Sequence, residues 1–355
     1  MSIQAFRYEG LPGRVLFGQG VISQLGDVIR EVGGTRALLL STPHQLDQAR
    51  TLAGHAGDLV VGHFSEATMH TPVEVTERAL TTLNDLSADC VVAIGGGSTI
   101  GLGKALALRT DVPHVAVATT YAGSEMTPIL GETVGARKTT QRTLKVLPEA
   151  VIYDVDLTLD LPLGMTATSG LNAIAHAVEG LYARDTNPVI RLLAEDAVRT
   201  FASALPRLVD TPRDPDARAD ALRAAWLCGM VLATTSMSLH HKLCHTLGGA
   251  FNLPHAETHS VVLPHALAYN APAAHEAMVA LRRAFGGEDP VMALVALARR
   301  IGAPTALRDI GMPADGIDLA ADEALRNPYW NPRAVERDGL RALIARAYAG
   351  DPPAA

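Results

Sequence analysis

Short apolar runs alternate with longer amphipathic segments in the first half of the chain. The runs at 37–40, 59–61, 90–94 and 114–118 each end at turn residues, which is typical of strands buried on both faces of a parallel sheet. The segments between them, such as 72–86, carry apolar residues at helical spacing. This alternation predicts an α/β fold with an open, mainly parallel sheet, whose ligands bind at the carboxyl ends of the strands.

The pattern changes at about residue 160, where the strand signals stop. Ala- and Leu-rich stretches that we expect to be helices cover 167–184, 188–205, 215–250, 274–284 and 290–302. The prolines expected to mark helix boundaries are Pro162, Pro188, Pro206, Pro212 and Pro264. We therefore expect an α/β domain over 1–159 and an all-α domain over 160–355, joined by a hinge at 160–163.

The composition is that of a globular protein: 355 residues, 48% hydrophobic and 19% charged, with a formal net charge of −7. The charge is spread along the chain and forms no basic patch of the kind that binds nucleic acid. No stretch has the character of a signal peptide or a membrane span. The three cysteines, Cys90, Cys228 and Cys244, are isolated. We expect a reduced, cytoplasmic protein with no nucleic-acid or membrane partner.

A glycine-rich turn follows the apolar run 90–94 directly. It reads Gly95-Gly96-Gly97-Ser98 and leads into a predicted helix at 100–108. Glycines let the backbone approach a ligand closely, and the N–H groups at a helix start attract a pyrophosphate. This makes Gly96, Gly97 and Ser98 candidate cofactor-binding residues. The spacing is not that of GxGxxG or of a Walker loop, and a ligand-free turn explains these residues equally well when they are taken alone.

A second candidate loop follows the apolar run 114–118. It contains the hydroxyl residues Thr119, Thr120, Ser124 and Thr127, which can reach ribose or phosphate oxygens. A loop capped by Ser and Thr, without a ligand, is the alternative. Because both loops begin at the carboxyl ends of predicted strands, together they favour a nucleotide site.

Histidines recur at helical spacing in the second half of the chain. Asn172 and His176 are four residues apart, as are His241 and His245, and His255 follows after a Gly-Gly break. Residues four apart share a helix face, so these imidazoles can converge to hold a metal ion or to donate a proton near neutral pH. We interpret Cys244 as a packing residue on another face of the same helix, not as a nucleophile.

The combination resembles the iron-containing alcohol dehydrogenase superfamily over almost the whole chain. The similar stretches are 17–20, the turn at 95–98, Thr119-Thr120, 123–125, 171–179, 245–255 and 331–333. The resemblance implies a dehydroquinate synthase-like fold, with a dinucleotide-binding α/β domain, an all-α domain and an active site in the cleft between them. It also implies a homodimer.

Two departures narrow the resemblance to one branch. Metal-binding members of the superfamily hold the ion with an Asp and three His, and the matching positions here are Asn172, His176, His241 and His255. A neutral amide is a weak ligand compared with a carboxylate. In addition, Gly101 stands where the family turn carries an Asp. Both departures are similar to the maleylacetate reductases.

That similarity implies NADH-dependent reduction of the carbon–carbon double bond of maleylacetate, an unsaturated oxo-dicarboxylate, to 3-oxoadipate in aromatic-compound degradation. No divalent metal would be required, although His176, His241 and His255 remain candidates for residual metal binding. His245 is expected to contact the nicotinamide or donate a proton, and the other three histidines to polarise the substrate or transfer protons.

The remaining expectations concern charged and polar groups around the two ligands. Lys242, Arg333 and Asn172 are candidates to bind the substrate. Lys138 matches the family lysine that approaches the cofactor. Thr42 stands where NAD-specific members carry an Asp for the ribose hydroxyls, so NADPH stays possible beside NADH.

Three other functions stay open at this point. One is a metal-dependent alcohol or aldehyde dehydrogenase of the same superfamily. The second is a dehydroquinate synthase-like lyase, which the amide at Asn172 disfavours because that chemistry depends on a bound metal. The third is a nucleotide-binding protein without catalytic activity.

Overall fold

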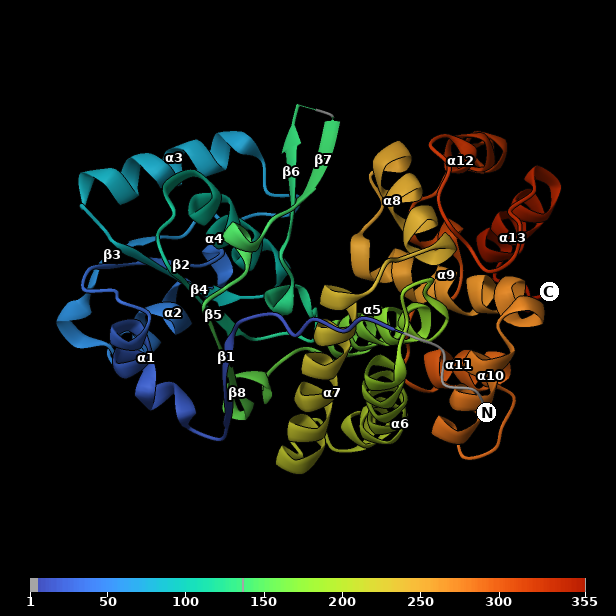
Figure 1. The fold of residues 1–355 in the computed structure, drawn as a ribbon, viewed down its shortest axis with the longest axis horizontal. Helices are drawn as coiled ribbons and strands as arrows, with labels where there is room; N and C mark the ends of the chain where they lie inside the picture. Colours follow the sequence, from blue (N-terminus) through green and yellow to red (C-terminus); the bar gives the residue numbers. More distant parts are fainter. Residues whose placement is uncertain (1–5, 136, 355) are drawn as a thin grey trace. The chain divides into compact units, whose positions relative to one another are not determined.

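The computed structural model describes residues 6–135 and 137–354, without the side chains of residues 137 and 138. The chain divides into two compact units (Figure 1). An α/β unit spans Leu11–Leu161, and a helical unit consists of residues 162–354 together with residues 6–10. The division at residue 161 lies within the stretch where the sequence predicts a hinge.

Six strands form one sheet in the α/β unit, in the order β1-β8-β5-β4-β2-β3. Every pairing in this sheet is parallel, which confirms the predicted mainly parallel sheet. The strands are β1 Arg14–Gly18, β2 Ala37–Leu40, β3 Val60–Phe64, β4 Cys90–Gly95, β5 His114–Ala118 and β8 Ala150–Asp154. The apolar runs predict β2 to β5 and miss β1 and β8.

A separate antiparallel hairpin pairs β6 (Ile129–Val134) with β7 (Arg137–Arg142). The sequence pattern does not predict this hairpin. Strand β7 reads Arg-Lys-Thr-Thr-Gln-Arg and so carries none of the apolar alternation that marks a half-buried strand.

Helices cover both faces of the large sheet, because successive side chains of a strand point to opposite faces. Leu38 and Leu40 of β2 join one apolar cluster with α3 and α4, while Leu39 joins another with α1 and α2. These helices are α1 Leu25–Glu31, α2 Leu46–Ala53, α3 Val73–Asp85 and α4 Gly97–Thr110. A sheet covered on both sides explains why its strands read as continuous apolar runs.

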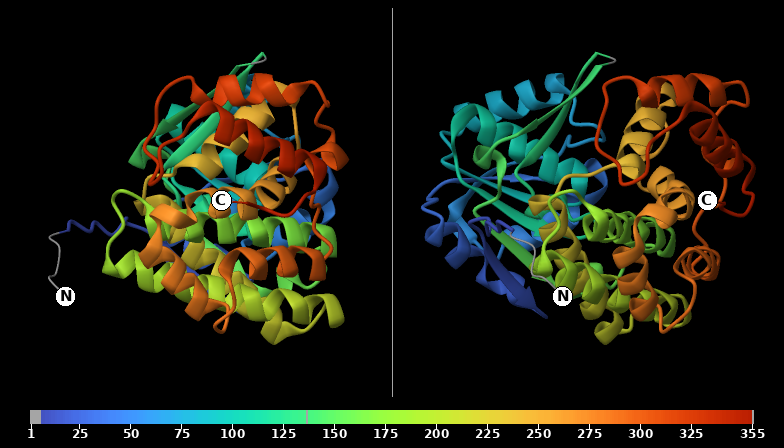
Figure 2. Two further views of the ribbon diagram at one scale, coloured as in Figure 1. Left: turned by 90° about the vertical axis from the view of Figure 1, so that its right-hand side faces the viewer. Right: turned by 45° about the vertical axis from the view of Figure 1, so that its right-hand side comes forward.

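The helical unit contains nine α-helices among the described residues. They are α5 Leu163–Tyr182, α6 Pro188–Asp210, α7 Pro215–Thr234, α8 Leu239–Phe251, α9 His255–Asn270, α10 His275–Ala284, α11 Pro290–Arg300, α12 Gly316–Leu325 and α13 Arg337–Ala349. Helices α5, α6 and α7 pack against one another (Figure 2). The all-α character predicted for this half is confirmed.

Some predicted helix boundaries are wrong. The stretch 215–250 is not one helix, because the chain breaks between α7 and α8 at residues 235–238. Helices α9, α12 and α13 are missing from the prediction. Pro206 and Pro264 lie inside α6 and α9 instead of at their ends. Proline removes one helical hydrogen bond, and tertiary packing compensates here, since Pro264 and its neighbours in α9 are buried.

No single helix among the described residues is long and apolar enough to cross a membrane. Helices α7 and α8 have the length and apolar composition of a membrane span only when they are taken together, and this pair is bent by 93° at the break between them.

Candidate functional site

The glycine-rich turn connects β4 to α4, and its geometry requires glycine. Gly95 has φ of +153°, and a Cβ there would lie 2.6 Å from Oγ1 of Thr99. A Cβ on Gly96 would lie 2.9 Å from Oγ1 of Thr120. Larger residues at either position would push into the neighbouring hydroxyl groups. The turn therefore keeps the backbone of Gly96, Gly97 and Ser98 open at the start of α4.

The predicted cofactor residues come together at one edge of the sheet. Strand β4 lies between β5 and β2, so the residues that follow these three parallel strands are neighbours. Gln45 links two of them: its Nε2 donates to Oγ1 of Thr119 over 3.1 Å, and its Oε1 accepts from Oγ1 of Thr42 over 3.2 Å. Gln45 is not among the residues predicted from the sequence, where its only signal is its position in the segment after β2.

Two buried hydroxyl groups flank the turn without a hydrogen-bond partner among the described residues. They are Oγ of Ser124 and Oγ1 of Thr99. A Cβ on Gly97 would lie 3.9 Å from the Ser124 hydroxyl. Buried polar atoms are nearly always paired in proteins, so these two hydroxyls are available to a polar ligand that rests on the turn.

The loop after β5 is held by a buried lysine. Lys104 of α4 is 1% exposed, and its Nζ donates to the carbonyls of Ser124, Thr127 and Ile129 and to Oγ1 of Thr127, over 2.5 to 3.0 Å. The Thr127 hydroxyl therefore belongs to the internal structure of the loop, which leaves its predicted cofactor contact without support. Burial lowers the pKa of Lys104 to about 7, against the opposing charge of Glu125.

In the helical unit, six histidines from three helices form one cluster. His176 lies on α5, His240, His241 and His245 lie on α8, and His255 and His259 lie on α9. Nδ1 of His176 lies 2.9 Å from Nε2 of His241. The His241 ring centroid is 5.0 Å from that of His259, and the His259 centroid is 4.2 Å from that of His255. Four of these residues are predicted from the sequence, whereas His240 and His259 are not.

The cluster has a buried part and an exposed rim. His176, His240, His241 and His259 are each at most 6% exposed, whereas His245 and His255 are exposed. The two rim rings stack with their centroids 6.3 Å apart. Burial lowers the pKa of His240 to about 4 and that of His259 well below its usual value. The rim histidines are thus the members best placed to meet a dissolved molecule.

A buried carboxylate anchors the cluster. Glu179 of α5 is fully buried, and its Oε2 lies 2.7 Å from Nδ1 of His241. It also accepts from the backbone N–H groups of Ser238 and His240, at 3.0 and 2.9 Å, at the start of α8. Burial alone would raise the pKa of Glu179, but the hydrogen bond and charge of His241, the charge of His240 and the Ser238 N–H lower it to about 2.

The donor set fits a divalent metal poorly. Both ring nitrogens of His241 already have partners, Glu179 and His176, and position 172 supplies a neutral amide whose buried Oδ1 has no hydrogen-bond partner among the described residues. His240, His241 and His259 do offer ligand atoms that all lie within 4.8 Å of one another. All three residues are histidines, so the set lacks the carboxylate that would offset the charge of a dication.

The predicted substrate cations have partners elsewhere in the helical unit. Nζ of Lys242 donates to the carbonyl of Arg326 over 2.9 Å and lies 5.7 Å from the centre of the Tyr329 ring. Arg333 donates to the carbonyl of Tyr269 and lies over its ring at 4.3 Å. The side chain of Lys138 lies outside the described residues.

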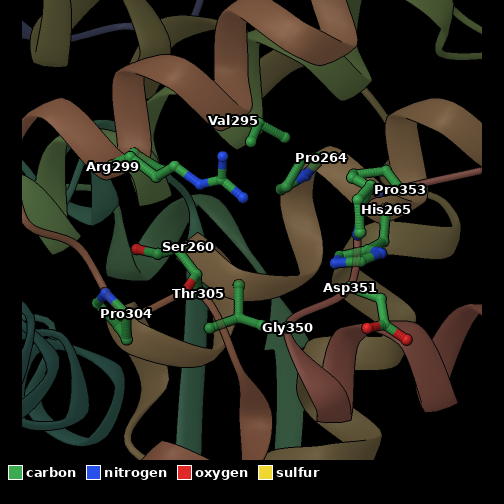
Figure 3. A pocket seen from close by; sticks show the side chains of 13 residues that line it. Ser260, Pro264, His265, Val295, Arg299, Pro304, Thr305, Gly350, Asp351 and Pro353 are labelled. Atoms are coloured by element: carbon green, nitrogen blue, oxygen red, sulfur yellow. The ribbon is translucent and has the colours of Figure 1, made fainter.

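Figure 3 shows a different pocket in the helical unit. It lies between α9, α11 and the C-terminal segment, and its polar lining includes His265, Arg299 and Asp351. Burial and the charge of Arg346 lower the pKa of His265 to about 4. None of the residues that the sequence singles out for function lines this pocket.

Comparison with known proteins agrees with the resemblance seen in the sequence. A family model described as iron-containing alcohol dehydrogenase matches residues 12–155, and the C-terminal model of the same family matches residues 166–348. The maleylacetate reductase of Burkholderia cepacia is 55% identical over 351 residues, which cover 99% of this chain and 100% of that protein. That of Sphingobium indicum is 54% identical over 348 residues, covering 98% and 99%.

A solved structure is also similar to this chain over its full length. The maleylacetate reductase from Agrobacterium tumefaciens is 51% identical, with a TM-score of 0.95 over 99% of this chain and 100% of that one. The chain therefore belongs to the iron-containing alcohol dehydrogenase family and, within it, to the maleylacetate reductases.

Proposed function

We propose that the protein uses NADH to reduce the carbon–carbon double bond of maleylacetate, which gives 3-oxoadipate. The observation that carries this proposal is a histidine cluster without a metal-binding carboxylate, in a chain that is 55% identical to a maleylacetate reductase over its whole length. Aromatic-compound degradation is the setting in which such a substrate arises.

The proposed reaction has two steps. Hydride adds to the alkene carbon that is beta to the ketone, and negative charge develops on the ketone oxygen as an enolate forms. A proton then reaches the carbon next to the ketone. Imidazole N–H groups can stabilise the enolate oxygen and supply the proton. We assign proton donation or nicotinamide contact to His245 on the exposed rim, and substrate polarisation to His255, His241 and His176.

The cofactor is proposed to bind at the turn of the α/β unit. The open backbone of residues 96–98 and the unpartnered hydroxyls of Ser124 and Thr99 support a pyrophosphate or ribose there. Thr42 carries no charge to repel a 2′-phosphate, so NADPH is a second cofactor to test. The proposal also includes a homodimer in the cytoplasm, and sedimentation of the purified protein tests the dimer.

No metal takes part in the proposed reaction. The amide at Asn172 and a group of possible ligand atoms that contains imidazoles alone support this, since an enolate can be stabilised by hydrogen bonds alone. Metal analysis of the purified protein, with turnover measured before and after chelation, tests the point. Stoichiometric iron or zinc that is needed for turnover would instead favour a metal-dependent alcohol dehydrogenase, with His240, His241 and His259 as the first ligands to examine.

The central experiment follows NADH absorbance after maleylacetate is added. We expect rapid loss of absorbance and formation of 3-oxoadipate. His245→Ala should reduce turnover at least about 100-fold, the usual scale for a general acid. His275→Ala is the matched control, because His275 is an exposed histidine at the start of α10 and should leave turnover unchanged. Absence of NADH oxidation in the unmodified protein would refute the proposed function.

A further inference from the structure

Glu179 accepts hydrogen bonds from several donors in a single short segment. Its two carboxylate oxygens accept from the backbone N–H groups of Ser238 and His240, from the Ser238 hydroxyl over 2.8 Å, and from the His241 ring. The donors all belong to residues 238–241 at the start of α8, while Glu179 itself comes from α5. A buried carboxylate thus fixes one helix end and one imidazole at the same time.

We propose that Glu179 is a positioning residue, which holds His241 with its hydrogen on Nδ1 and thereby sets the direction of the hydrogen bond between His241 and His176. This inference rests on the proposed function for its effect on turnover, but the position of the hydrogen can be tested without any substrate.

The carboxylate of Glu179 can only accept from the His241 ring. An ionised carboxylate has no hydrogen to donate, so the 2.7 Å contact requires the hydrogen of His241 to be on Nδ1. In the neutral ring, Nε2 then carries a lone pair. Nδ1 of His176, 2.9 Å away, must be the donor to that lone pair, and Nε2 of His176 is left without a hydrogen. One carboxylate therefore sets the donor and acceptor nitrogens of two successive rings.

This order matters for the proposed chemistry because each imidazole nitrogen can act only as a donor or only as an acceptor in a given form. If the hydrogen of His241 moved to Nε2, His176 would accept from it and would present an N–H at its own Nε2. For a histidine that ligates a metal, replacing the partner that fixes its tautomer commonly costs about 10- to 100-fold in metal affinity or activity, and we take the same scale for His241. Glu179 is the partner that fixes the tautomer of His241.

A second carboxylate, that of Asp185, allows the proposed positioning of His241 to be distinguished from hydrogen bonding to a helix start. Asp185 accepts from the backbone N–H of Ser236 at 2.9 Å and from its hydroxyl at 2.9 Å. Both acidic residues therefore bind an N–H and a hydroxyl in the segment between α7 and α8. Only Glu179 has a contact with a histidine ring. Asp185→Asn is thus the matched control for Glu179→Gln.

The experiment measures nitrogen chemical shifts of the full chain labelled with ¹⁵N-histidine, together with steady-state kinetics. The His241 signals are identified by their loss in His241→Gln. In the unmodified protein we expect a protonated Nδ1 and an unprotonated Nε2. Glu179→Gln replaces the carboxylate by a neutral amide. Its NH₂ group faces a backbone N–H whichever of the two oxygens it replaces, and the His241 ring no longer has a charged acceptor. We expect a mixture of tautomers at His241 and a kcat lower by about 10- to 100-fold, with the KM for NADH unchanged.

The controls make the result decisive. Asp185→Asn should leave both the His241 signals and kcat as in the unmodified protein, and Glu179→Asp should restore the Nδ1–H signal because it restores an ionised acceptor. If Glu179→Gln does not fold, the unmodified protein still provides a test, since a hydrogen on Nε2 of His241 overturns the inference. Unchanged signals and kcat in a folded Glu179→Gln would also overturn it. A protein that fails to reduce maleylacetate but shows the Nδ1–H signal would refute the proposed function and support the inference.

Discussion

Each unit of the protein contains a buried charged group that holds a segment beside that unit's own candidate residues. In the α/β unit, Lys104 holds the loop after β5 through the carbonyls of Ser124, Thr127 and Ile129. In the helical unit, Glu179 holds the start of α8 through N–H groups and the His241 ring. Both side chains are at most 1% exposed, and both attach an element to residues far away in the sequence.

The two groups differ in how well their hydrogen bonds offset burial. The hydrogen-bond partners of Lys104 are uncharged, and the carboxyl group near it, Glu125, has a pKa raised by its own burial. The pKa of Lys104 consequently falls to about 7. Glu179 accepts from the His241 ring and from N–H groups at the start of α8, and its pKa falls to about 2 in spite of its burial. Burial thus takes Lys104 close to neutrality at physiological pH, while Glu179 keeps its charge.

The difference shows that equal burial does not mean equal electrostatic cost. A buried ion without a charged partner loses its hydration and shifts its pKa toward the neutral form. A buried carboxylate that accepts several hydrogen bonds from N–H groups remains ionised. We therefore expect the protein to depend on the charge of Glu179 more strongly than on the charge of Lys104.

Removal of the Glu179 side chain should have the largest effect. Glu179→Ala leaves the N–H groups of Ser238 and His240 and the ring of His241 without their buried acceptor. Each buried donor left unsatisfied costs about 1–3 kcal/mol, so we expect a loss of stability of about 3–5 kcal/mol. Denaturant unfolding monitored by circular dichroism measures the change. If Glu179→Ala lowers the free energy of unfolding by less than Lys104→Met does under the same conditions, the protein depends more on Lys104 than on Glu179, contrary to our expectation.

The sequence predicts elements well where local pattern determines them. Strand β5 occurs at the predicted residues 114–118, and the turn at 95–98 connects a strand to a helix as expected. The break between α7 and α8 is missed because it depends on distant groups: Glu179 and Asp185 bind residues 236–241 from more than fifty positions away. No helical periodicity within 215–250 contains that information.

In the candidate site, too, contacts between distant residues could not be predicted from the local sequence. Four residues of the histidine cluster follow from spacing and family resemblance, and His259 could have been added, because it lies four residues after His255 just as His245 lies four after His241. Glu179 lies three residues after His176, and nothing in its neighbourhood reveals that it binds another helix. Gln45 is likewise defined only by the side chains that the sheet places beside it.

A second prediction concerns the pH dependence that Lys104 produces. Its pKa is about 7 in the folded protein and 10.5 in the absence of burial, so between these values the unfolded chain binds more protons and stability rises with pH. From pH 7 to pH 9 the gain is about 2 kcal/mol, since one pKa unit corresponds to about 1.4 kcal/mol. Lys104→Met, which cannot titrate, should lack this gain when unfolding is measured at several pH values.

The pH range for that measurement has an upper limit. Burial raises the pKa values of Cys90 and Cys228 above the usual value of 9.0, so above pH 9 the unfolded chain loses thiol protons that the folded protein keeps, and stability falls. Equal slopes for the unmodified protein and Lys104→Met between pH 7 and pH 9 would show that Lys104 stays charged in the folded state.

A smaller effect is expected for His114, a buried group close to Lys104. Neither ring nitrogen of His114 has a hydrogen-bond partner among the described residues, and burial together with the charge of Lys104 lowers its pKa to about 3. Below pH 6.5 the unfolded chain binds a proton that the folded protein excludes, so stability falls on acidification. His114→Leu should lessen this fall by about 1 kcal/mol between pH 6.5 and pH 5.5, as measured by denaturant unfolding. An identical pH profile would contradict it.

The smallest effect is expected for Asp185→Asn. Asp185 resembles Glu179 in what it binds, the N–H and hydroxyl of one residue before α8, but these hydrogen bonds are exposed to solvent. Water can replace an exposed acceptor, and an amide oxygen can still accept from an N–H, so the expected loss of stability is about 0.5 kcal/mol, at the low end for a cap. Thermal unfolding of Asp185→Asn beside Glu179→Gln compares the two positions directly. If the two variants lose the same stability, capping alone explains both carboxylates; if Glu179→Gln loses several times more, its burial and its contact with His241 account for the difference.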